Sequence, residues 1–136
     1  MKKSWVEKRE NQKSVQVKIL QKKFADMPEG IKMLIPTPKT VDQFVKNIPT
    51  GVFLNLKSLR KELAHKYEAE MTCPIVTGIS LRIISEAAFE EYEFHKDENL
   101  MTPFWRVVEP GSKLAEKLTC GINFIIEKQI MEGIER

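Results

Sequence analysis

The stretch Thr102-Pro103-Phe104-Trp105-Arg106-Val107-Val108 decides the fold assignment of this sequence. Pro103 biases the preceding residue away from helical backbone, and the aromatic and β-branched residues that follow favour an extended chain. We therefore predict a short strand at residues 102–108. Pro110-Gly111-Ser112 then forms a turn, and isoleucines at helical spacing after Gly121 predict a last helix.

Amphipathic patterns predict three further helices on the N-terminal side of this stretch. One spans residues 41–48, and a second follows Asn55, which is a candidate N-cap. A third begins at Thr72-Cys73-Pro74, because proline is tolerated in the first turn of a helix. We expect this third helix at about residues 74–88. The acidic residues beyond Ala88 predict its end and a solvated loop.

Charge divides the chain into a basic N-terminal arm, residues 1–35, and a main domain, residues 36–136. Residues 1–36 hold nine Lys or Arg against four Asp or Glu, whereas residues 37–136 hold 13 against 15. Within the arm we predict a short polar helix at residues 4–13 and a strand over Val15 to Ile19. The arm is interpreted as a solvated polar segment, with a polyanion partner as the alternative.

Length and composition exclude several classes of protein. The chain has 136 residues, of which 42% are hydrophobic and 30% charged, as in one soluble globular domain. No apolar run is long enough to span a bilayer, and the N-terminus lacks the apolar region of a secretory signal. Two cysteines are too few for a disulfide scaffold. We therefore expect a cytoplasmic protein with no membrane partner.

The residue pattern shows no catalytic or metal-binding motif. His65 and His95 have no neighbouring nucleophile, and each is expected to be a surface histidine. Cys73 and Cys120 lack zinc-ligand spacing, so we expect no metal and no cofactor. Cys120 precedes a helix start, where backbone N–H groups can stabilise a thiolate; the alternative is an inert, half-buried thiol.

The order of these elements indicates a mainly α fold with a small β element, of the winged helix-turn-helix type. The segment Pro103-Phe104-Trp105-Arg106-Val107-Val108 also resembles the Pro-Cys-His-Arg-Val active-site motif of the O6-alkylguanine-DNA alkyltransferases. Ile48-Pro49-Thr50-Gly51 resembles that family's Ile-Pro-x-Gly turn, Gly121 falls near its glycine pair, and Glu132-Gly133 resembles its Glu-Gly near the last helix end. The resemblance covers residues 36–136 and implies the fold of the alkyltransferase C-terminal domain.

More specifically, the sequence resembles a prokaryotic branch of alkyltransferase-like proteins, which carry an aromatic-Trp-Arg in place of Cys-His-Arg. Met33-Leu34-Ile35-Pro36-Thr37-Pro38 and Thr72-Cys73-Pro74 carry this finer likeness. Phe104 stands at the position of the acceptor cysteine and Trp105 at that of its histidine, while Glu132 is kept. Because a benzyl ring cannot accept an alkyl group by displacement, we expect no alkyl transfer here and no enzyme of that kind.

The resemblance also implies altered base flipping. The family inserts an arginine where the base leaves the stack, and the matching position here is near Gly78; a family tyrosine is matched by Leu56. Thr77 or Arg82 is a candidate substitute. Phe104 and Trp105 would either stack on a base or plug the former pocket. Arg106 would contact phosphate or form a structural ion pair.

From these observations we predict a non-catalytic DNA-binding protein that resembles alkyltransferase-like lesion sensors and is linked to DNA repair. The candidate DNA contacts are Lys57, Arg60, Lys61, Thr77, Gly78, Arg82 and Arg106. The third helix would place Thr77, Gly78 and Arg82 on its exposed face. The alternative is a protein-interaction module that kept the fold without DNA binding. A third hypothesis is residual alkyl acceptance at Cys120 or Cys73.

Overall fold

The computed structural model describes residues 4–134, which form a mostly helical fold with a small three-stranded sheet. The predicted class, mainly α with a small β element, is confirmed. In chain order the elements are α1 (Trp5–Arg9), β1 (Gln16–Ile19), β2 (Lys32–Ile35), α2 (Pro38–Lys46), α3 (Leu56–Lys66), β3 (Met71–Thr72), α4 (Pro74–His95), the 3-10 turns η1 (Glu98–Leu100) and η2 (Phe104–Arg106), α5 (Lys113–Lys117) and α6 (Ile122–Met131).

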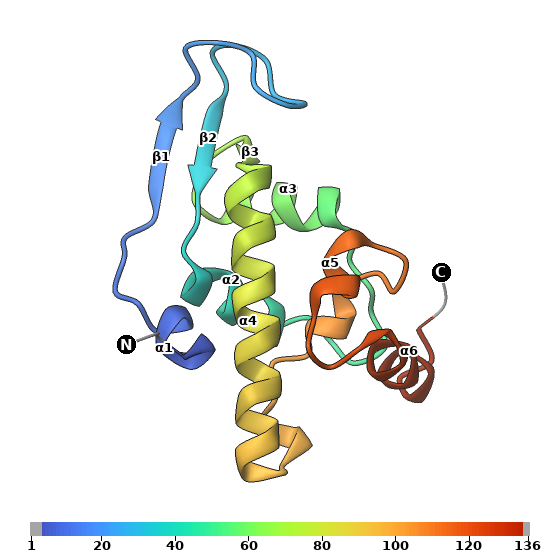
Figure 1. Ribbon diagram of the computed structural model, residues 1–136. Coiled ribbons are helices and arrows are strands. Elements are labelled where there is room, and N and C mark those ends of the chain that lie inside the picture. The colour runs from blue at the N-terminus through green and yellow to red at the C-terminus, as the bar shows by residue number, and fades with distance from the viewer. Residues whose placement is uncertain (1–3, 135–136) are drawn as a thin grey trace.

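Helix α4 is the central element of the molecule (Figure 1). Helices α1 and α2 pack against it, and α5 and α6 lie on its other side. The β1–β2 hairpin projects past the N-terminal end of α4, where β3 and α3 also lie. No helix within residues 4–134 is both long and apolar enough to cross a membrane.

Local sequence signals fix most helix starts. Asn55 is the N-cap of α3 as predicted, and its Oδ1 accepts a hydrogen bond from Ser58 N–H at 2.9 Å. Thr37 caps α2 through a bond from Thr40 N–H, and Pro74 opens α4. These caps satisfy backbone donors that a helix leaves unpaired at its first turn.

The sheet joins the predicted arm to the predicted domain. Strand β1 lies where the alternating valines and isoleucine predicted a strand, and it pairs antiparallel with β2, with Val17 opposite Leu34. Strand β2 in turn pairs in parallel with β3, with Leu34 opposite Thr72. Leu34 is fully buried, whereas all four residues of β1 are exposed. Both faces of β2 are therefore covered, since Leu34 belongs to the main core and its neighbour Met33 to a smaller cluster with Met27 and Cys73, whereas β1 is an open edge.

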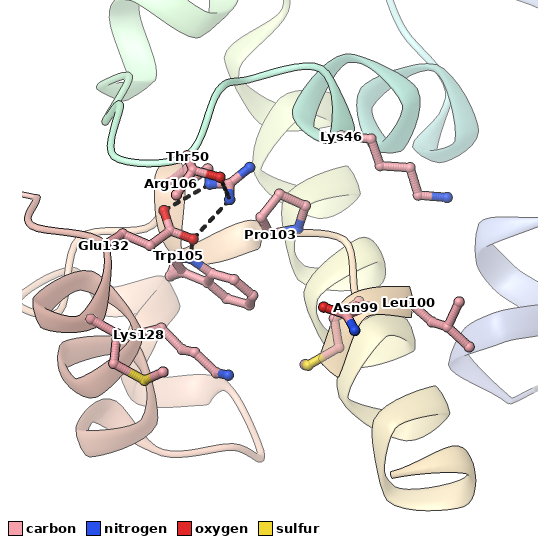
Figure 2. A pocket seen from close by; sticks show the side chains of 11 residues that line it. Lys46, Thr50, Asn99, Leu100, Pro103, Trp105, Arg106, Lys128 and Glu132 are labelled. Atoms are coloured by element: carbon pink, nitrogen blue, oxygen red, sulfur yellow. Dashed lines mark hydrogen bonds and ion pairs between the residues drawn. The ribbon is translucent and has the colours of Figure 1, made fainter. Parts of the chain in front are cut away.

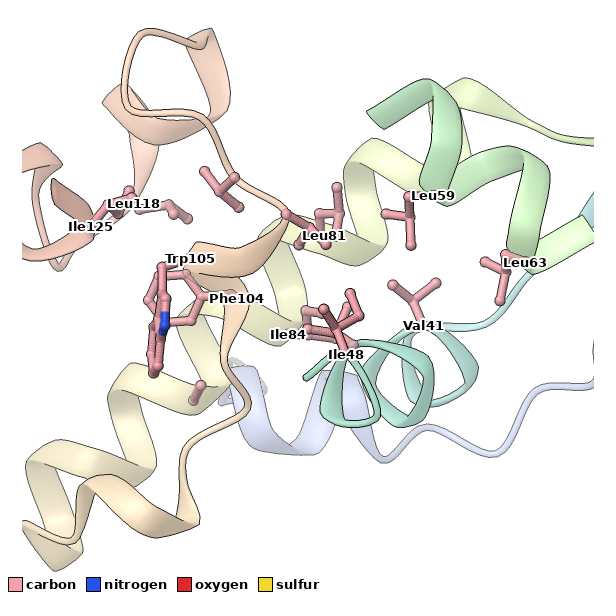
Figure 3. Packing of buried hydrophobic residues seen from close by; sticks show 14 of the residues in the cluster. Val41, Ile48, Leu59, Leu63, Leu81, Ile84, Phe104, Trp105, Leu118 and Ile125 are labelled. Carbon is pink, nitrogen blue, oxygen red and sulfur yellow. The ribbon is translucent and has the colours of Figure 1, made fainter. Parts of the chain in front are cut away.

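The hydrophobic core lies between α2, α3, α4 and α6 (Figure 3). Phe104 is its largest fully buried side chain. Its ring stacks on Phe124, with centroids 6.1 Å apart, and meets the Trp105 ring edge-on at 5.4 Å. The other buried members shown include Val41, Ile48, Leu59, Leu63, Leu81, Ile84, Leu118 and Ile125.

The predicted strand at residues 102–108 was wrong, because this segment forms the 3-10 turn η2. Val107 N–H and Val108 N–H both donate to Phe104 O at 3.0 Å. In a strand, successive side chains point to opposite faces, so either Phe104 or Trp105 would face solvent. The turn instead buries both rings, with exposed fractions of 0% and 5%.

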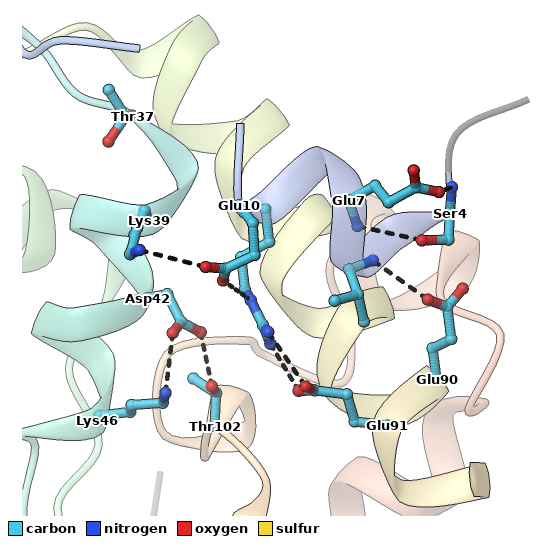
Figure 4. Close-up of polar contacts among 12 residues, drawn as sticks. Ser4, Glu7, Glu10, Thr37, Lys39, Asp42, Lys46, Glu90, Glu91 and Thr102 are labelled. Carbon is cyan, nitrogen blue, oxygen red and sulfur yellow. Dashed lines mark hydrogen bonds and ion pairs between the residues drawn. The ribbon is translucent and has the colours of Figure 1, made fainter. Parts of the chain in front are cut away.

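The predicted end of the third helix near Ala88 was also wrong, since α4 continues to His95. Two of the acidic residues beyond Ala88 have partners in α1 (Figure 4). Glu90 accepts hydrogen bonds from Val6 N–H at 3.2 Å and Trp5 N–H at 3.3 Å. Glu91 pairs with the buried Arg9 guanidinium at 2.6 Å. The expectation of a solvated arm therefore fails for α1.

The exposed face of α4 is also different from the predicted one. Thr77 is fully buried, and its hydroxyl donates to Cys73 O at 2.7 Å. Ile75 and Ile79 are instead 57% and 55% exposed. Four-residue spacing places isoleucines on one face of the helix, but it does not state whether that face is the buried one.

Candidate functional site

The first candidate site is built around Glu132, at the C-terminal end of α6 (Figure 2). Its Oε1 accepts hydrogen bonds from Arg106 Nε at 2.8 Å and Gly51 N–H at 3.1 Å. Its Oε2 accepts from Trp105 Nε1 and Arg106 Nη2, both at 2.8 Å. Four donors from η2 and the 48–51 turn thus converge on one carboxylate. We call Trp105, Arg106 and Glu132 the Trp105–Glu132 site.

The polar groups of the Trp105–Glu132 site satisfy one another. Arg106 Nη1 also donates to Ile48 O at 2.7 Å, and Nη2 donates to Thr50 Oγ1 at 3.0 Å. Burial on its own raises the pKa of the Glu132 carboxyl, but the hydrogen bonds from Arg106 and Trp105 outweigh it and hold the pKa below its usual value. Of the two roles expected for Arg106, the structure supports the ion pair, because every guanidinium nitrogen donates inside the protein.

Phe104 and Trp105 are both packed as core side chains. Phe104 is fully buried, and Trp105 is 5% exposed with its indole N–H committed to Glu132. Gln129 Nε2 donates to Trp105 O at 2.9 Å and to Val108 O at 3.2 Å, which fixes the turn from the other side. This packing supports the plug rather than the stacking platform.

The two thiols do not form a reactive site. Burial raises the pKa of the Cys120 thiol to about 11, and the nearby Glu86 carboxylate adds to the rise. The thiol is therefore protonated at neutral pH, which favours the inert, half-buried thiol over the stabilised thiolate. Cys73 is buried. No group of three or more metal-ligating side chains occurs among the described residues.

A second candidate site is a groove on the open face of α4, between α1 and α5. Its volume is about 560 Å³. It is lined by Trp5, Lys8, Pro74, Ile75, Gly78, Ile79, Arg82, Ile83, Leu114 and Lys117, which we call the α4 groove. Three of these residues are cations and none is an acid. The floor is apolar, and an added Cβ at Gly78 would meet no atom within 4 Å.

Two of the three cations of the α4 groove contact the Trp5 ring. Lys8 Nζ lies 4.2 Å from the centroid of the Trp5 ring, and the Arg82 guanidinium carbon lies 5.3 Å from it. Arg82 Nε is buried without a hydrogen-bond partner and lies 3.9 Å from a Glu86 carboxylate oxygen. The Arg82 side chain as a whole is 39% exposed and lines the groove.

The structure separates the residues predicted to bind DNA. Gly78 and Arg82 lie in the α4 groove, and Lys57 and Lys61 are exposed on α3. Arg60 was expected on the outer side of α3, which was wrong: it is 5% exposed, pairs with Asp26 at 2.8 Å and donates to Thr72 O. The Thr77 hydroxyl and the Arg106 guanidinium likewise donate hydrogen bonds to acceptors inside the protein.

Sequence reasoning missed several residues of the α4 groove. Lys8 and Lys117 reach it from α1 and α5, which are each only five residues long and carry no pattern that places them beside α4. Ile75 and Ile79 belong to a row of apolar residues at helical spacing in the sequence, but such a row usually predicts the buried face of a helix. No family model, no curated protein and no solved structure matches this chain.

Proposed function

We propose that this chain is a non-catalytic DNA-binding protein of the alkyltransferase-like kind, linked to DNA repair, in which the first three turns of α4 face the duplex. One observation carries the proposal: the α4 groove presents Lys8, Arg82 and Lys117 and no carboxylate. Phosphate oxygens dominate the affinity of DNA-binding proteins and are recognised by such cations. The winged helix-turn-helix arrangement, with α3 and α4 as its two helices, is part of the same proposal.

The chemistry of the motif region supports a role without alkyl transfer. Phe104 has no nucleophilic atom, and Trp105 has no basic nitrogen at neutral pH. Glu132, which would orient a proton relay in the resembled enzymes, here accepts hydrogen bonds from Arg106 and Trp105. The features that favour binding therefore lie in the α4 groove, and those of the motif region are structural.

The apolar floor of the α4 groove is compatible with a minor-groove contact. Proteins that bind the minor groove insert apolar side chains at base steps while cations hold the flanking phosphates. Ile75 and Ile79 are more than half exposed and stand next to Arg82 on the same helix face. Gly78, without a side chain, lets a sugar–phosphate backbone approach α4 closely.

The test is fluorescence anisotropy with a labelled duplex over a salt series. Three phosphate contacts predict a slope of about −3 in log affinity against log salt. Lys8→Gln should reduce that slope by about 1. Lys96→Gln is the matched control, because it removes the same charge from an exposed side chain at the opposite end of α4. No binding at low salt, or equal losses in both variants, would overturn the proposal.

A second duplex with O6-methylguanine tests whether the protein senses the lesion. We expect nearly equal affinity for the two duplexes, because Phe104 fills the former pocket and Gly78 cannot occupy the gap left by a flipped base. Much tighter binding to the lesion would mean that the aromatic plug opens to admit a base.

A protein partner is the second candidate function, and the exposure of Ile75 and Ile79 favours it. Apolar side chains on an open helix face are typical of grooves that receive an amphipathic helix. The flanking cations would then pair with acidic residues of the partner. Absence of DNA binding, together with affinity for an acidic amphipathic peptide that Ile79→Ser abolishes, would establish this function instead.

A further inference from the structure

The far side of strand β1 is an open edge of the sheet. Strand β1 stands at one end of the strand order β1-β2-β3 and pairs with β2 alone. Figure 1 shows it as the outermost strand, with β2 between it and β3. An edge strand presents backbone N–H and C=O groups that no neighbouring strand satisfies, and a second extended chain can pair with them.

The pairing register identifies which backbone groups of β1 point outward. Leu20 N–H donates to Ile31 O at 3.0 Å, and Leu20 O accepts from Gly30 N–H at 2.9 Å, so the backbone of Leu20 faces β2. This direction alternates from residue to residue along an antiparallel strand. The N–H and C=O groups of Val17 and Ile19 therefore point away from β2, toward the open edge.

The side chains give the two faces of this edge different character. Val17 and Ile19 lie on one face and are 44% and 59% exposed, although Val17 stands opposite Leu34 of the main core. Lys18 lies on the other face, opposite Met33. A strand added beside β1 would thus place apolar side chains next to the valine and the isoleucine, and the residue between them next to a lysine.

The segment around β1 is basic and has no carboxylate of its own. Residues 11–25 contain no aspartate or glutamate but four lysines, which are Lys13, Lys18, Lys22 and Lys23. All four are exposed, and none of them forms an ion pair with another residue of the described range 4–134. In α1, by contrast, Arg9 pairs with Glu91. A chain that lies along β1 is therefore attracted if it carries carboxylates.

We infer that the open edge of β1 binds an extended acidic peptide segment of another protein, which adds a fourth strand to the sheet. The backbone groups of Val17 and Ile19 would pair with the peptide backbone, and Lys18 would face a carboxylate of the peptide. Recognition of this kind takes its affinity from main-chain hydrogen bonds and its specificity from alternate side chains. The inference does not rest on the proposed DNA interaction, which uses the α4 groove.

Charge and backbone chemistry favour this occupant over two others. If two copies of the chain paired through both outward-facing residues of β1, Val17 of each would stand opposite Ile19 of the other, and the two Lys18 side chains would face each other. Like charges directly opposite destabilise a strand pair. A nucleic acid would satisfy the lysines, but it has no row of alternating amide N–H and C=O groups for the strand edge.

The test is fluorescence anisotropy with a labelled, acetylated and amidated peptide of alternating glutamate and valine. We expect saturable binding with a Kd of about 0.1 mM or tighter at low salt. Two further peptides carry N-methyl groups on all valines or on all glutamates. Successive N–H groups of a strand point to opposite edges, so only one of these peptides loses the donors that face β1. Its affinity should be at least about tenfold lower than that of the other.

Variants of β1 test the same edge from the side of the protein. Ile19→Pro removes an N–H that points outward and leaves the bonds between β1 and β2 in place, so it should weaken peptide binding at least about tenfold. Ile19→Ala is the matched control, because it removes the same side chain and keeps the N–H. Lys18→Gln should weaken binding about threefold at low salt, whereas Lys113→Gln, at an exposed lysine on α5, should not.

Four results would overturn the inference. They are the absence of saturable peptide binding at low salt, equal affinity for the two methylated peptides, equal losses in Ile19→Pro and Ile19→Ala, and a dimer in sedimentation that Ile19→Pro dissociates. The comparison of methylated peptides uses the unaltered protein, so it remains decisive if the proline variant unfolds. Duplex affinity should be the same in Ile19→Pro as in wild type, which distinguishes a failure here from a failure of the DNA proposal.

Discussion

The charged side chains of the Trp105–Glu132 site are paired inside the protein, whereas those of the α4 groove are partly exposed. In the first, the side chains of Arg106 and Glu132 are 12% exposed, and every nitrogen of the guanidinium donates to an acceptor within the protein. In the second, Arg82 retains a buried Nε without a hydrogen bond, and two isoleucines beside it face solvent. The comparison teaches that the residues resembling a reactive motif now stabilise the fold, whereas the features suited to a partner lie on the neighbouring helix.

The largest expected effect comes from removing the aromatic plug. Phe104→Ala should reduce the free energy of unfolding by about 4 kcal/mol, because it deletes a fully buried ring and leaves a cavity against Phe124. Urea denaturation measures the change. A loss below about 1 kcal/mol would mean that Phe104 is not part of the packed core.

Glu132→Gln should be the next largest change, with a loss of about 3 kcal/mol, since it leaves Arg106 without its counter-charge. The pKa of Glu132 is lowered in the folded state, so its contribution is complete above the unfolded pKa near 4.5 and is lost as pH falls through the folded pKa. Wild-type stability should therefore drop from pH 6 to pH 3 more steeply than that of the variant. Parallel pH profiles would contradict this account.

Arg82→Gln should separate binding from stability. We expect a stability loss of about 1 kcal/mol, because the variant leaves the buried Glu86 carboxylate without its nearby cation, and a loss of duplex affinity of about five- to tenfold near 0.1 M salt. Thermal unfolding and anisotropy measure the two effects on one preparation. A large loss of stability with unchanged affinity would reverse the roles assigned to the two regions.

Phe104→Cys should have no effect on reactivity, although it restores the acceptor atom of the resembled motif. Trp105 supplies no base to generate the thiolate, and its indole N–H is already bound to Glu132. Intact mass after exposure to O6-methylguanine DNA should show no methyl gain. Uptake of a methyl group at an enzyme-like rate would show that the site remains competent.

Local signals in the sequence were sufficient to predict the elements whose conformation depends on residues close together in the chain. Asn55 and Pro74 marked helix starts correctly, and the alternation at Val15 to Ile19 marked β1. The errors arose where tertiary contacts determine the conformation of a segment or the length of a helix. Residues 104–106 form a 3-10 turn because this conformation buries the rings of both Phe104 and Trp105. Helix α4 continues past Ala88 because α1 supplies donors to Glu90 and Glu91.

The same distinction applies to the candidate site. Glu132 and Arg106 were identified by their motif positions, but their mutual pairing required η2 and the end of α6 to meet. Arg60 was misassigned because its partner Asp26 lies in the hairpin between β1 and β2, 34 positions away. Charge counts along a helix do not reveal such a partner.

The most direct test of the central claim maps where a DNA duplex contacts the protein. Backbone amide chemical shifts, followed by NMR as an unmodified duplex is added, report every region of the chain at once. We predict the largest changes in α1, in residues 74–83 of α4 and in α5, with little change around Trp105 and Glu132. Changes centred on the Trp105–Glu132 site, or no changes at all at low salt, would contradict the account.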